Sequence, residues 1–228
     1  MRNTCTILAT LLVLTSLEQV SAQSNIDPEN KWAWSENCGW TNWQHDAPEP
    51  EDGVLVAQTH LAGFVWGENI GWINLGDGDG PYANDMEDSS TFGVNLDFDS
   101  GELSGFAWGE NVGWINFDGG AMADPPNPAR LEGCRLAGFA WGENIGWINF
   151  DDETHFVSLN LDCPADLNND CDVEAADLAE LLGDWGPCEE PCEPGDPATT
   201  CAADLSGDCE VEAFDLAILL GSWGSCFE

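Results

Sequence analysis

The chain has 228 residues, with 43 acidic side chains against 4 lysines and arginines, and a formal net charge of −39. This balance excludes a nucleic-acid-binding surface, because nothing in it replaces the counterions around phosphates, and it argues against docking on an anionic membrane. Hydrophobic residues make up 43% of the chain, with 12 Trp and 10 Phe, which is too apolar for a disordered acidic segment.

Residues 1–22 have the pattern of a secretory signal peptide. Arg2 gives a positive start, an apolar stretch runs from Ile7 to Leu17, and small residues up to Ala22 form a cleavage site. The apolar stretch is too short to span a bilayer, and no second one of membrane length follows it in the sequence. We therefore predict a secreted protein, extracellular or at a cell surface, with no membrane span.

A tryptophan-rich unit occurs four times in residues 23–162. It reads Trp-Gly-Glu-Asn-Ile-Gly-Trp-Ile-Asn from Trp66 to Asn74, and related units begin at Trp34, Trp108 and Trp141. Apolar side chains alternate on both sides of the Gly-Glu-Asn segment, which predicts a β-hairpin in each unit. Further strands are expected at residues 53–57, 92–97 and 155–161. We expect the last of these to pair with the first unit and so remove a free sheet edge. The prediction is an antiparallel β domain of hairpins over residues 23–162.

The tryptophans of the units admit two interpretations. Their identical placement in every unit favours packing in the core, where cross-strand aromatic pairs stabilise a sheet. The alternative is a row of exposed platforms that stack on sugar rings. Under that alternative the carbohydrate-binding residues are Trp66, Trp72, Trp108, Trp114, Trp141 and Trp147. Exposure of these side chains to solvent distinguishes the two.

No motif in the sequence predicts catalysis. The histidines, His45, His60 and His155, are scattered, and neither a Gly-x-Ser-x-Gly segment nor a His-Glu-x-x-His segment occurs. The repeated glutamates occupy the same turn in each copy, whereas a catalytic carboxylate needs surroundings of its own. We expect these glutamates to be turn or cross-strand hydrogen-bond partners; they are Glu68, Glu110 and Glu143. The protein is therefore predicted not to be an enzyme.

The C-terminal part, residues 163–228, contains a duplicated segment. Residues 163–188 and 201–226 share 18 of 26 positions. Within each copy, oxygen-bearing side chains fall at positions 1, 3, 5, 9 and 12 of a loop, as in EF-hand-type calcium loops. The predicted ligands of the first Ca²⁺ are Asp166, Asn168, Asp170, the carbonyl of Asp172, Glu174 and Asp177. Those of the second are Asp204, Ser206, Asp208, the carbonyl of Glu210, Glu212 and Asp215.

Each calcium loop is followed by a short predicted helix. Leucines and a tryptophan recur at helical spacing, and glycines stand at the predicted ends. The stripes comprise Leu178, Leu181, Leu182 and Trp185 in the first copy, and Leu216, Leu219, Leu220 and Trp223 in the second. Both stripes are predicted to be core.

A calcium loop followed by a single helix, duplicated and closed by Asp at position 12, resembles the type I dockerin module. The resemblance covers Cys163 to Cys226 and implies two bound Ca²⁺ ions and docking on a cohesin-like or other extracellular partner. Position 6, where φ > 0 favours glycine, is cysteine in both copies, and the usual hydroxyl pair before the final Asp is replaced by Ala175-Ala176 and Ala213-Phe214. The tryptophan units resemble repeats of secreted bacterial proteins to which no function is attached.

The cysteines agree with an oxidising compartment. Removal of the signal peptide leaves nine of the 10 cysteines, so at least one is free or pairs with another molecule. Several connectivities are compatible with the sequence. The pairings that would staple each unit and link the two loops are Cys163–Cys188, Cys201–Cys226 and Cys171–Cys209.

Together these features predict a secreted, non-catalytic, calcium-binding interaction or structural protein that docks through its C-terminal module. The alternative is a carbohydrate-binding accessory protein of polysaccharide degradation, acting through the tryptophans of the β domain.

Overall fold

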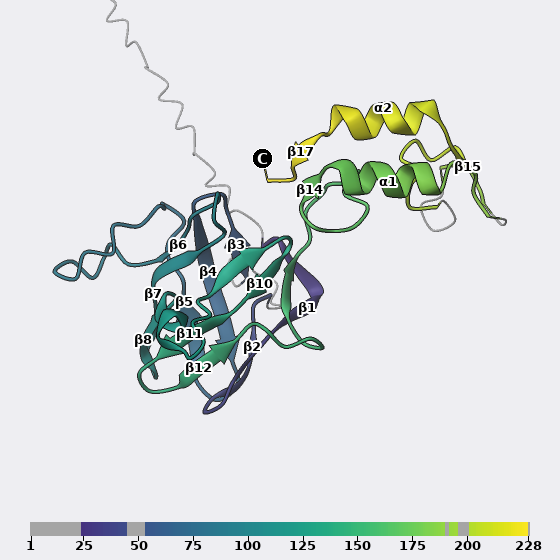
Figure 1. The fold of residues 1–228 in the computed structure, drawn as a ribbon. Coiled ribbons are helices and arrows are strands. Elements are labelled where there is room, and N and C mark those ends of the chain that lie inside the picture. Colours follow the sequence, from purple (N-terminus) through teal and green to yellow (C-terminus); the bar gives the residue numbers. More distant parts are fainter. Residues whose placement is uncertain (1–23, 45–52, 190–191, 196–200, 228) are drawn as a thin grey trace, which may run out of the picture.

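The computed structural model describes residues 24–44, 53–189, 192–195 and 201–227. The predicted signal peptide lies outside these residues. Figure 1 shows a body of β-strands and, beside it, a pair of helices near the C-terminus. The predicted fold class, mainly β with a small helical C-terminal module, is confirmed.

The four tryptophan units form four antiparallel hairpins that close into one ring. The second strand of each hairpin pairs with the first strand of the next. The last strand pairs back with the first, with Trp34 opposite Asn149 and Ser35 opposite Ile148. The ring consists of β1 (Ile26–Ser35), β2 (Gly39–Asn42), β4 (His60–Gly67), β5 (Gly71–Asn74), β7 (Leu103–Gly109), β8 (Gly113–Asn116), β11 (Phe139–Gly142) and β12 (Gly146–Asn149).

Short strands extend this ring outside the hairpins. They are β3 (Val54–Val56), β6 (Val94–Leu96), β9 (Arg130–Glu132), β10 (Arg135–Ala137) and β13 (Val157–Leu159), with a 3₁₀ helix η1 at Gly119–Met122. β3 and β6 pair with β4, and β6 also pairs with β7. β13 pairs with β1, where Ile26 lies opposite Leu159, so the predicted pairing of residues 155–161 with the first unit is confirmed. β10 lies between β13 and β9. The β9–β10 hairpin is not predicted, because its strands are too short to show an alternating pattern.

The ring interior is filled by the residues that alternate with the tryptophans. The buried residues of the strands are Ala33, Thr41, Val65, Ile73, Ala107, Ile115, Ala140 and Ile148. The residue that follows each second strand is buried as well, and these residues are Trp43, Leu75, Phe117 and Phe150. Three of their rings meet, because Trp43 lies 5.2 Å from Phe150 and 6.3 Å from Phe117 between ring centroids. These side chains form the main apolar core.

An asparagine at each hairpin turn fastens one unit to its neighbour. Each donates a side-chain hydrogen bond to a carbonyl of the preceding unit. The donor and acceptor pairs are Asn69 and Cys38 at 3.0 Å, Asn111 and Ile70 at 2.9 Å, and Asn144 and Val112 at 2.9 Å. Asn37 completes the circle by donating to Ile145 at 3.1 Å. The adjacent glutamates, for which we expected this role, are exposed.

The two C-terminal units pack head to tail. The helices α1 (Ala175–Gly183) and α2 (Ala213–Gly221) run side by side in Figure 1. Two-residue strands join the units at both ends, with β14 (Asp172–Val173) pairing with β17 (Gly224–Ser225), and β15 (Gly186–Pro187) with β16 (Glu210–Val211). The beginning of each unit therefore lies next to the end of the other. A second apolar cluster, which includes Leu181 and Leu219, lies between them.

The head-to-tail packing determines how the cysteines at the ends of the two units are paired, and the two pairings predicted for these cysteines are wrong. Cys163 is bonded to Cys226, and Cys188 to Cys201. The predicted bonds Cys163–Cys188 and Cys201–Cys226 would join the two ends of one unit. Head-to-tail packing instead brings the first cysteine of each unit to the last cysteine of the other.

The cysteines at position 6 of the loops are not bonded to each other either. Cys171 is bonded to Cys134 in the β9–β10 turn, and Cys209 to Cys192 in the segment between the two units. The predicted Cys171–Cys209 bond is therefore wrong, because each loop faces a nearer cysteine outside its unit. The free cysteine among the described residues is Cys38, which is buried.

Three contacts fix the helical module to the β body. The first is the Cys134–Cys171 disulfide. In the second, Gln58 Nε2 donates to the carbonyl of Phe227 at 2.8 Å. In the third, the rings of Phe98 and Phe227 meet at 5.3 Å between centroids. The loop that carries Cys171 is thus held against the β body.

Candidate metal centre and aromatic surface

The first predicted calcium loop brings three carboxylates together. Oxygens of Asp166, Asp170 and Asp177 lie within 4.8 Å of one another. The first two come from the loop before β14, and Asp177 comes from the first turn of α1. Ca²⁺ takes about six to eight oxygen ligands from carboxylates, amides, carbonyls and water. The chemistry of this donor set, with carboxylates from positions 1, 5 and 12, fits that ion.

Backbone hydrogen bonds curl the loop around Asp166. Its two carboxylate oxygens accept from the N–H groups of Asp170 at 3.0 Å and Cys171 at 2.8 Å. Asn168 turns toward the same point, because its Nδ2 donates to Asp170 at 2.9 Å. Positions 1, 3 and 5 therefore face one point before any ion is considered.

Asp177 ties the start of the loop to the start of the helix. It is fully buried and accepts from the N–H groups of Leu167 at 2.8 Å, Asn168 at 3.2 Å and Glu174 at 2.8 Å. The Glu174 side chain accepts in return from the N–H of Asp177, which completes a capping box. The predicted water-mediated ligand Glu174 is thus also the N-cap of α1, a role that its position three residues before Asp177 could have revealed.

The electrostatics of the first loop favour a cation. Burial, and then repulsion from Asp170 and Asp177, raise the pKa of Asp166 above its ordinary value, although hydrogen bonds from Cys171 and Asp170 oppose this. The pKa of Asp172 is raised by burial and by repulsion from Asp170, Asp166 and Asp177. Crowded carboxylates disfavour their charged forms, and a bound cation removes that repulsion.

The second loop has a similar set of backbone hydrogen bonds, but its carboxylates do not come as close together as those of the first loop. Asp204 accepts from the N–H groups of Gly207 at 2.8 Å, Asp208 at 3.1 Å and Cys209 at 2.7 Å. Asp215 is buried and accepts from Ser206 and Glu212, both at 2.8 Å. Burial acts to raise the pKa of Asp215, but these hydrogen bonds outweigh it and lower the pKa. Among the described residues, a group of three close carboxylates occurs in the first loop and not in this one.

The remaining predicted ligands occupy the rims of the loops. Asp172 and Glu210, expected to act through their carbonyls, begin the short strands β14 and β16. Glu212 caps α2 as Glu174 caps α1. Ser206 donates its hydroxyl to Asp204 at 3.2 Å, so the side chains of positions 1 and 3 are in contact in the second loop too.

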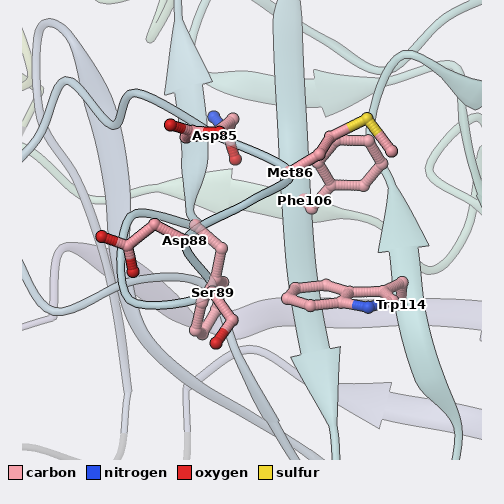
Figure 2. Close-up of a pocket in the computed structure, with 8 residues that line it drawn as sticks. Asp85, Met86, Asp88, Ser89, Phe106 and Trp114 are labelled. Atoms are coloured by element: carbon pink, nitrogen blue, oxygen red, sulfur yellow. The ribbon is translucent and has the colours of Figure 1, made fainter.

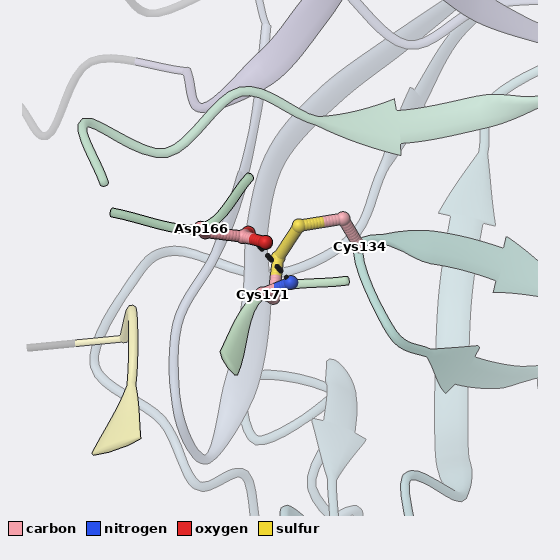
Figure 3. Close-up of side chains that lie close together, drawn as sticks. All are labelled: Cys134, Asp166 and Cys171. Carbon is pink, nitrogen blue, oxygen red and sulfur yellow. Dashed lines mark hydrogen bonds between the residues drawn. A yellow bond between two sulfur atoms is a disulfide. The ribbon is translucent and has the colours of Figure 1, made fainter. Parts of the chain in front are cut away.

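The cysteines at position 6 adopt the backbone that this position requires. The φ angles are +71° at Cys171 and +75° at Cys209, in the region that favours glycine. Both cysteines are disulfide-bonded, which holds the strained conformation in place. Figure 3 shows Asp166 accepting from the Cys171 N–H beside the Cys134–Cys171 bond. Because the sulfurs of Cys134 and Cys171 are bonded to each other, these two cysteines have a structural role and do not form a metal site with Asp166.

The helical stripes are only partly core, which corrects the prediction. Leu181 and Leu219 are buried between the units. Leu178 and Leu216 are partly buried and pack against the same cluster. The other four large side chains of the stripes are about half exposed, and they are Leu182, Trp185, Leu220 and Trp223. Helices of nine residues that meet along one line bury only the central leucine of each stripe.

The tryptophans of the hairpins lie on the outside of the ring, so their predicted core position is wrong. The exposed fraction is 37% for Trp72 and 42% for Trp114, and Trp66, Trp108, Trp141 and Trp147 are partly buried. Each hairpin carries an edge-to-face pair with ring centroids 4.6–4.8 Å apart. The pairs stabilise the sheet from outside, while the interior holds smaller residues.

An open groove separates two of these pairs. Trp72 and Trp108 line it with Phe64, Asn74 and Glu110, and its volume is about 480 Å³. Asn74 lies opposite Trp108 on the paired strands β5 and β7. The groove combines aromatic faces with amide and carboxylate groups, which is the chemistry that neutral sugars need.

Within the described residues, no helix is long and apolar enough to cross a membrane. No protein-family model matches this chain, and no curated protein and no solved structure matches it either.

Proposed function

We propose that this chain is a secreted, non-catalytic calcium-binding protein that docks on an extracellular partner through its C-terminal helical module. The observation that carries the proposal is the convergence of Asp166, Asp170 and Asp177 within 4.8 Å in the first loop. Asp166 and Asp170 would hold Ca²⁺ together with Asn168, and Asp177 would close the site. The bound ion would fix the loop to the first turn of α1.

The docking surface would use the exposed apolar side chains at the end of each unit. Leu182 and Trp185 on the first unit correspond to Leu220 and Trp223 on the second, and all four are 48–52% exposed. Aromatic and aliphatic side chains at the centre of an interface carry most of its binding energy. No lysine or arginine occurs after residue 135, so the expected partner is a cohesin-like or other extracellular protein with an apolar patch and a basic rim.

The test uses the full oxidised chain, immobilised, with cohesin domains and secreted proteins as probes. We expect capture in calcium and loss of capture in chelator. The double variant Trp185→Ala, Trp223→Ala should lose capture while it keeps its bound calcium. Met122→Ala, which removes an apolar, 71% exposed side chain from the β body, is the control. Capture that survives both the chelator and the double variant would contradict docking through this surface.

A second candidate function is binding of neutral polysaccharide by the β domain. It is favoured by the outward-facing indoles and by the groove between Trp72 and Trp108. Indole faces stack on the apolar faces of sugar rings, and Asn74 and Glu110 would bond their hydroxyls.

Retention on insoluble polysaccharides tests this candidate. The variant Trp108→Ala should elute earlier than the wild type, and circular dichroism should show that it stays folded despite the loss of its ring pair with Trp114. Trp185→Ala, which removes an exposed indole outside the β domain, should elute with the wild type. Equal elution of all three proteins would eliminate the groove as a polysaccharide site.

A further inference from the structure

A separate pocket lies where a loop folds over the third hairpin. The loop of residues 84–92 lies between β5 and β6, and the pocket beneath it has a volume of about 200 Å³. Its apolar walls are Met86, Phe92, Phe106 and Trp114. Figure 2 shows Met86 beside Phe106, with Trp114 facing the loop that carries Asp88 and Ser89. The volume is below that of typical drug-sized sites, so the pocket suits a single small group.

The aromatic walls stand at steep angles to one another. The ring of Phe92 is 5.4 Å from that of Trp114 and inclined by 75° to it. The ring of Phe106 is 6.2 Å away and inclined by 73°. Trp114 thus has two phenyl rings standing against it, and Met86 adds a polarisable side chain. Rings set at steep angles around one space are the arrangement of the aromatic cages that recognise methylated ammonium groups.

The rim of the pocket carries two carboxylates. Asp88 accepts through Oδ1 from both the N–H of Ser90 at 3.0 Å and its hydroxyl at 2.6 Å. These hydrogen bonds lower the pKa of Asp88, so the carboxylate is ionised at neutral pH. Asp85 accepts through Oδ1 from the N–H of Glu87 at 2.9 Å. In each carboxylate, one oxygen accepts hydrogen bonds from the 84–92 loop, which fixes the orientation of the group. Both side chains line the pocket.

We propose that this pocket binds a quaternary ammonium group, with Trp114, Phe92 and Phe106 around the methyl groups and with Asp85 and Asp88 supplying negative charge at the rim. An anion would meet two carboxylates and a net charge of −39, which excludes anionic ligands. A bare metal ion would gain nothing from the apolar walls. An ammonium group with methyl substituents uses both the walls and the rim.

The neighbouring unit supplies a matched control within the same chain. Trp72 occupies the place of Trp114 in the preceding hairpin, with Phe64 at 6.2 Å and 78° in the place of Phe106. It lines the open groove and not the pocket under the loop. The extra residues between the second and third units build that loop, so Trp114 lines a pocket with it, whereas Trp72 has no such loop beside it.

The test is a titration of the full chain with choline at constant ionic strength, followed by calorimetry and by the indole N–H signals in NMR spectra. We expect the Trp114 signal to shift, and we expect Trp114→Ala to weaken binding about tenfold. Trp72→Ala should bind choline like the wild type. If Trp114→Ala fails to fold, Asp88→Asn, which keeps the shape of the rim, should weaken binding several-fold.

Two further ligands separate the outcomes. The neutral isostere 3,3-dimethylbutan-1-ol should bind more weakly than choline, and a trimethyllysine peptide distinguishes a protein-borne group from a free base. Equal binding of choline and the neutral isostere would show a merely hydrophobic pocket and overturn the proposal. It would also be overturned if choline caused no shift of the Trp114 signal up to about 100 mM.

Discussion

The side-chain amide of Asn37 donates a 3.1 Å hydrogen bond to the carbonyl of Ile145, 108 residues further along the chain. The same carbonyl accepts from the hydroxyl of Ser35 at 3.0 Å. These two bonds lie beside the pairing of β12 with β1, where the ring joins its last unit to its first. The equivalent asparagines join consecutive units, so one residue type serves both the local joints and the closure.

Replacing Asn37 with Ala should lower the free energy of unfolding by about 1 kcal/mol, the net value of one intramolecular hydrogen bond. Asn69→Ala should cost a similar amount, because it removes the same bond at a local joint. Glu36→Ala, at an exposed neighbouring position, is the control and should change little. Urea unfolding measures all three, and an Asn37→Ala protein as stable as Glu36→Ala would show that the bond contributes nothing to closure.

Because Trp43 and Trp114 differ in exposure, replacing them should lower the free energy of unfolding by different amounts. Trp43 is 2% exposed inside the ring, so Trp43→Ala should lower the free energy of unfolding by about 3–5 kcal/mol. Trp114 is 42% exposed, and Trp114→Ala should lose about 1–2 kcal/mol, mainly from its ring pairs. Thermal unfolding compares the two variants. Equal costs would contradict the placement of the hairpin indoles outside the ring.

Cys38 occupies the buried position that Ile70, Val112 and Ile145 hold in the other units. Burial raises the pKa of its thiol above the ordinary value of 9.0, because the thiolate is poorly solvated there. The folded state therefore binds this proton more tightly than the unfolded state does. Its contribution to stability is present below about pH 9 and is lost as the pH rises through the raised pKa.

The variant Cys38→Val should consequently lose less stability than the wild type as the pH rises above about 9. Val fits because a valine fills the same position in the third unit. In the folded wild type, alkylation of Cys38 should require denaturant. Rapid labelling under native conditions, or a stability difference between the two proteins that does not change with pH, would contradict a buried, protonated thiol.

The hairpins and the acidic loops are visible in the sequence because each depends on spacing within a few residues. The direction of the tryptophans is not, because alternation defines two faces without saying which one is inside. Between the hairpin strands the interior of the closed eight-stranded ring is filled by side chains such as Ala33 and Ile115, together with the ring of Trp43 that follows β2, so the paired indoles of the hairpins lie on the outer face. The expectation that the largest aromatic side chains pack in the core therefore puts the hairpin tryptophans on the wrong face of the sheet.

The disulfides depend on packing that no local pattern encodes. Head-to-tail contact of the two C-terminal units decides which of the cysteines at their ends meet, and the bond to Cys134 depends on how the module sits on the β9–β10 turn. The pocket beside Trp114 likewise requires a loop from one unit to fold over the hairpin of the next.

Peptide mapping of the oxidised protein should recover the Cys134–Cys171 and Cys192–Cys209 bonds as well as the two inter-unit ones.

Calcium should stabilise the C-terminal module without being needed to keep it compact. Two disulfides join the units and a third ties the first loop to the β body, so the chain cannot expand far when the ion is removed. An ion bound only by the folded state adds about 4 kcal/mol when its concentration is a thousandfold above its dissociation constant. Chelation should therefore lower the unfolding temperature of the module while much of its helical circular dichroism remains.

Variants of the loops separate ligation from structure. Asp170→Asn should weaken the first site, since it removes one of three converging charges and leaves the backbone bonds to Asp166 in place. Asp177→Ala and Asp215→Ala should each abolish one of two bound ions, and Asp177→Ala should also destabilise α1, because that carboxylate holds three backbone N–H groups. Asp184→Asn, at the other end of α1, is the control.

The first loop should bind more tightly than the second, because only there do three carboxylates converge among the described residues. Calorimetry that detects no calcium uptake by the oxidised chain, or equal affinities in Asp170→Asn and Asp184→Asn, would remove the acidic loops as calcium sites.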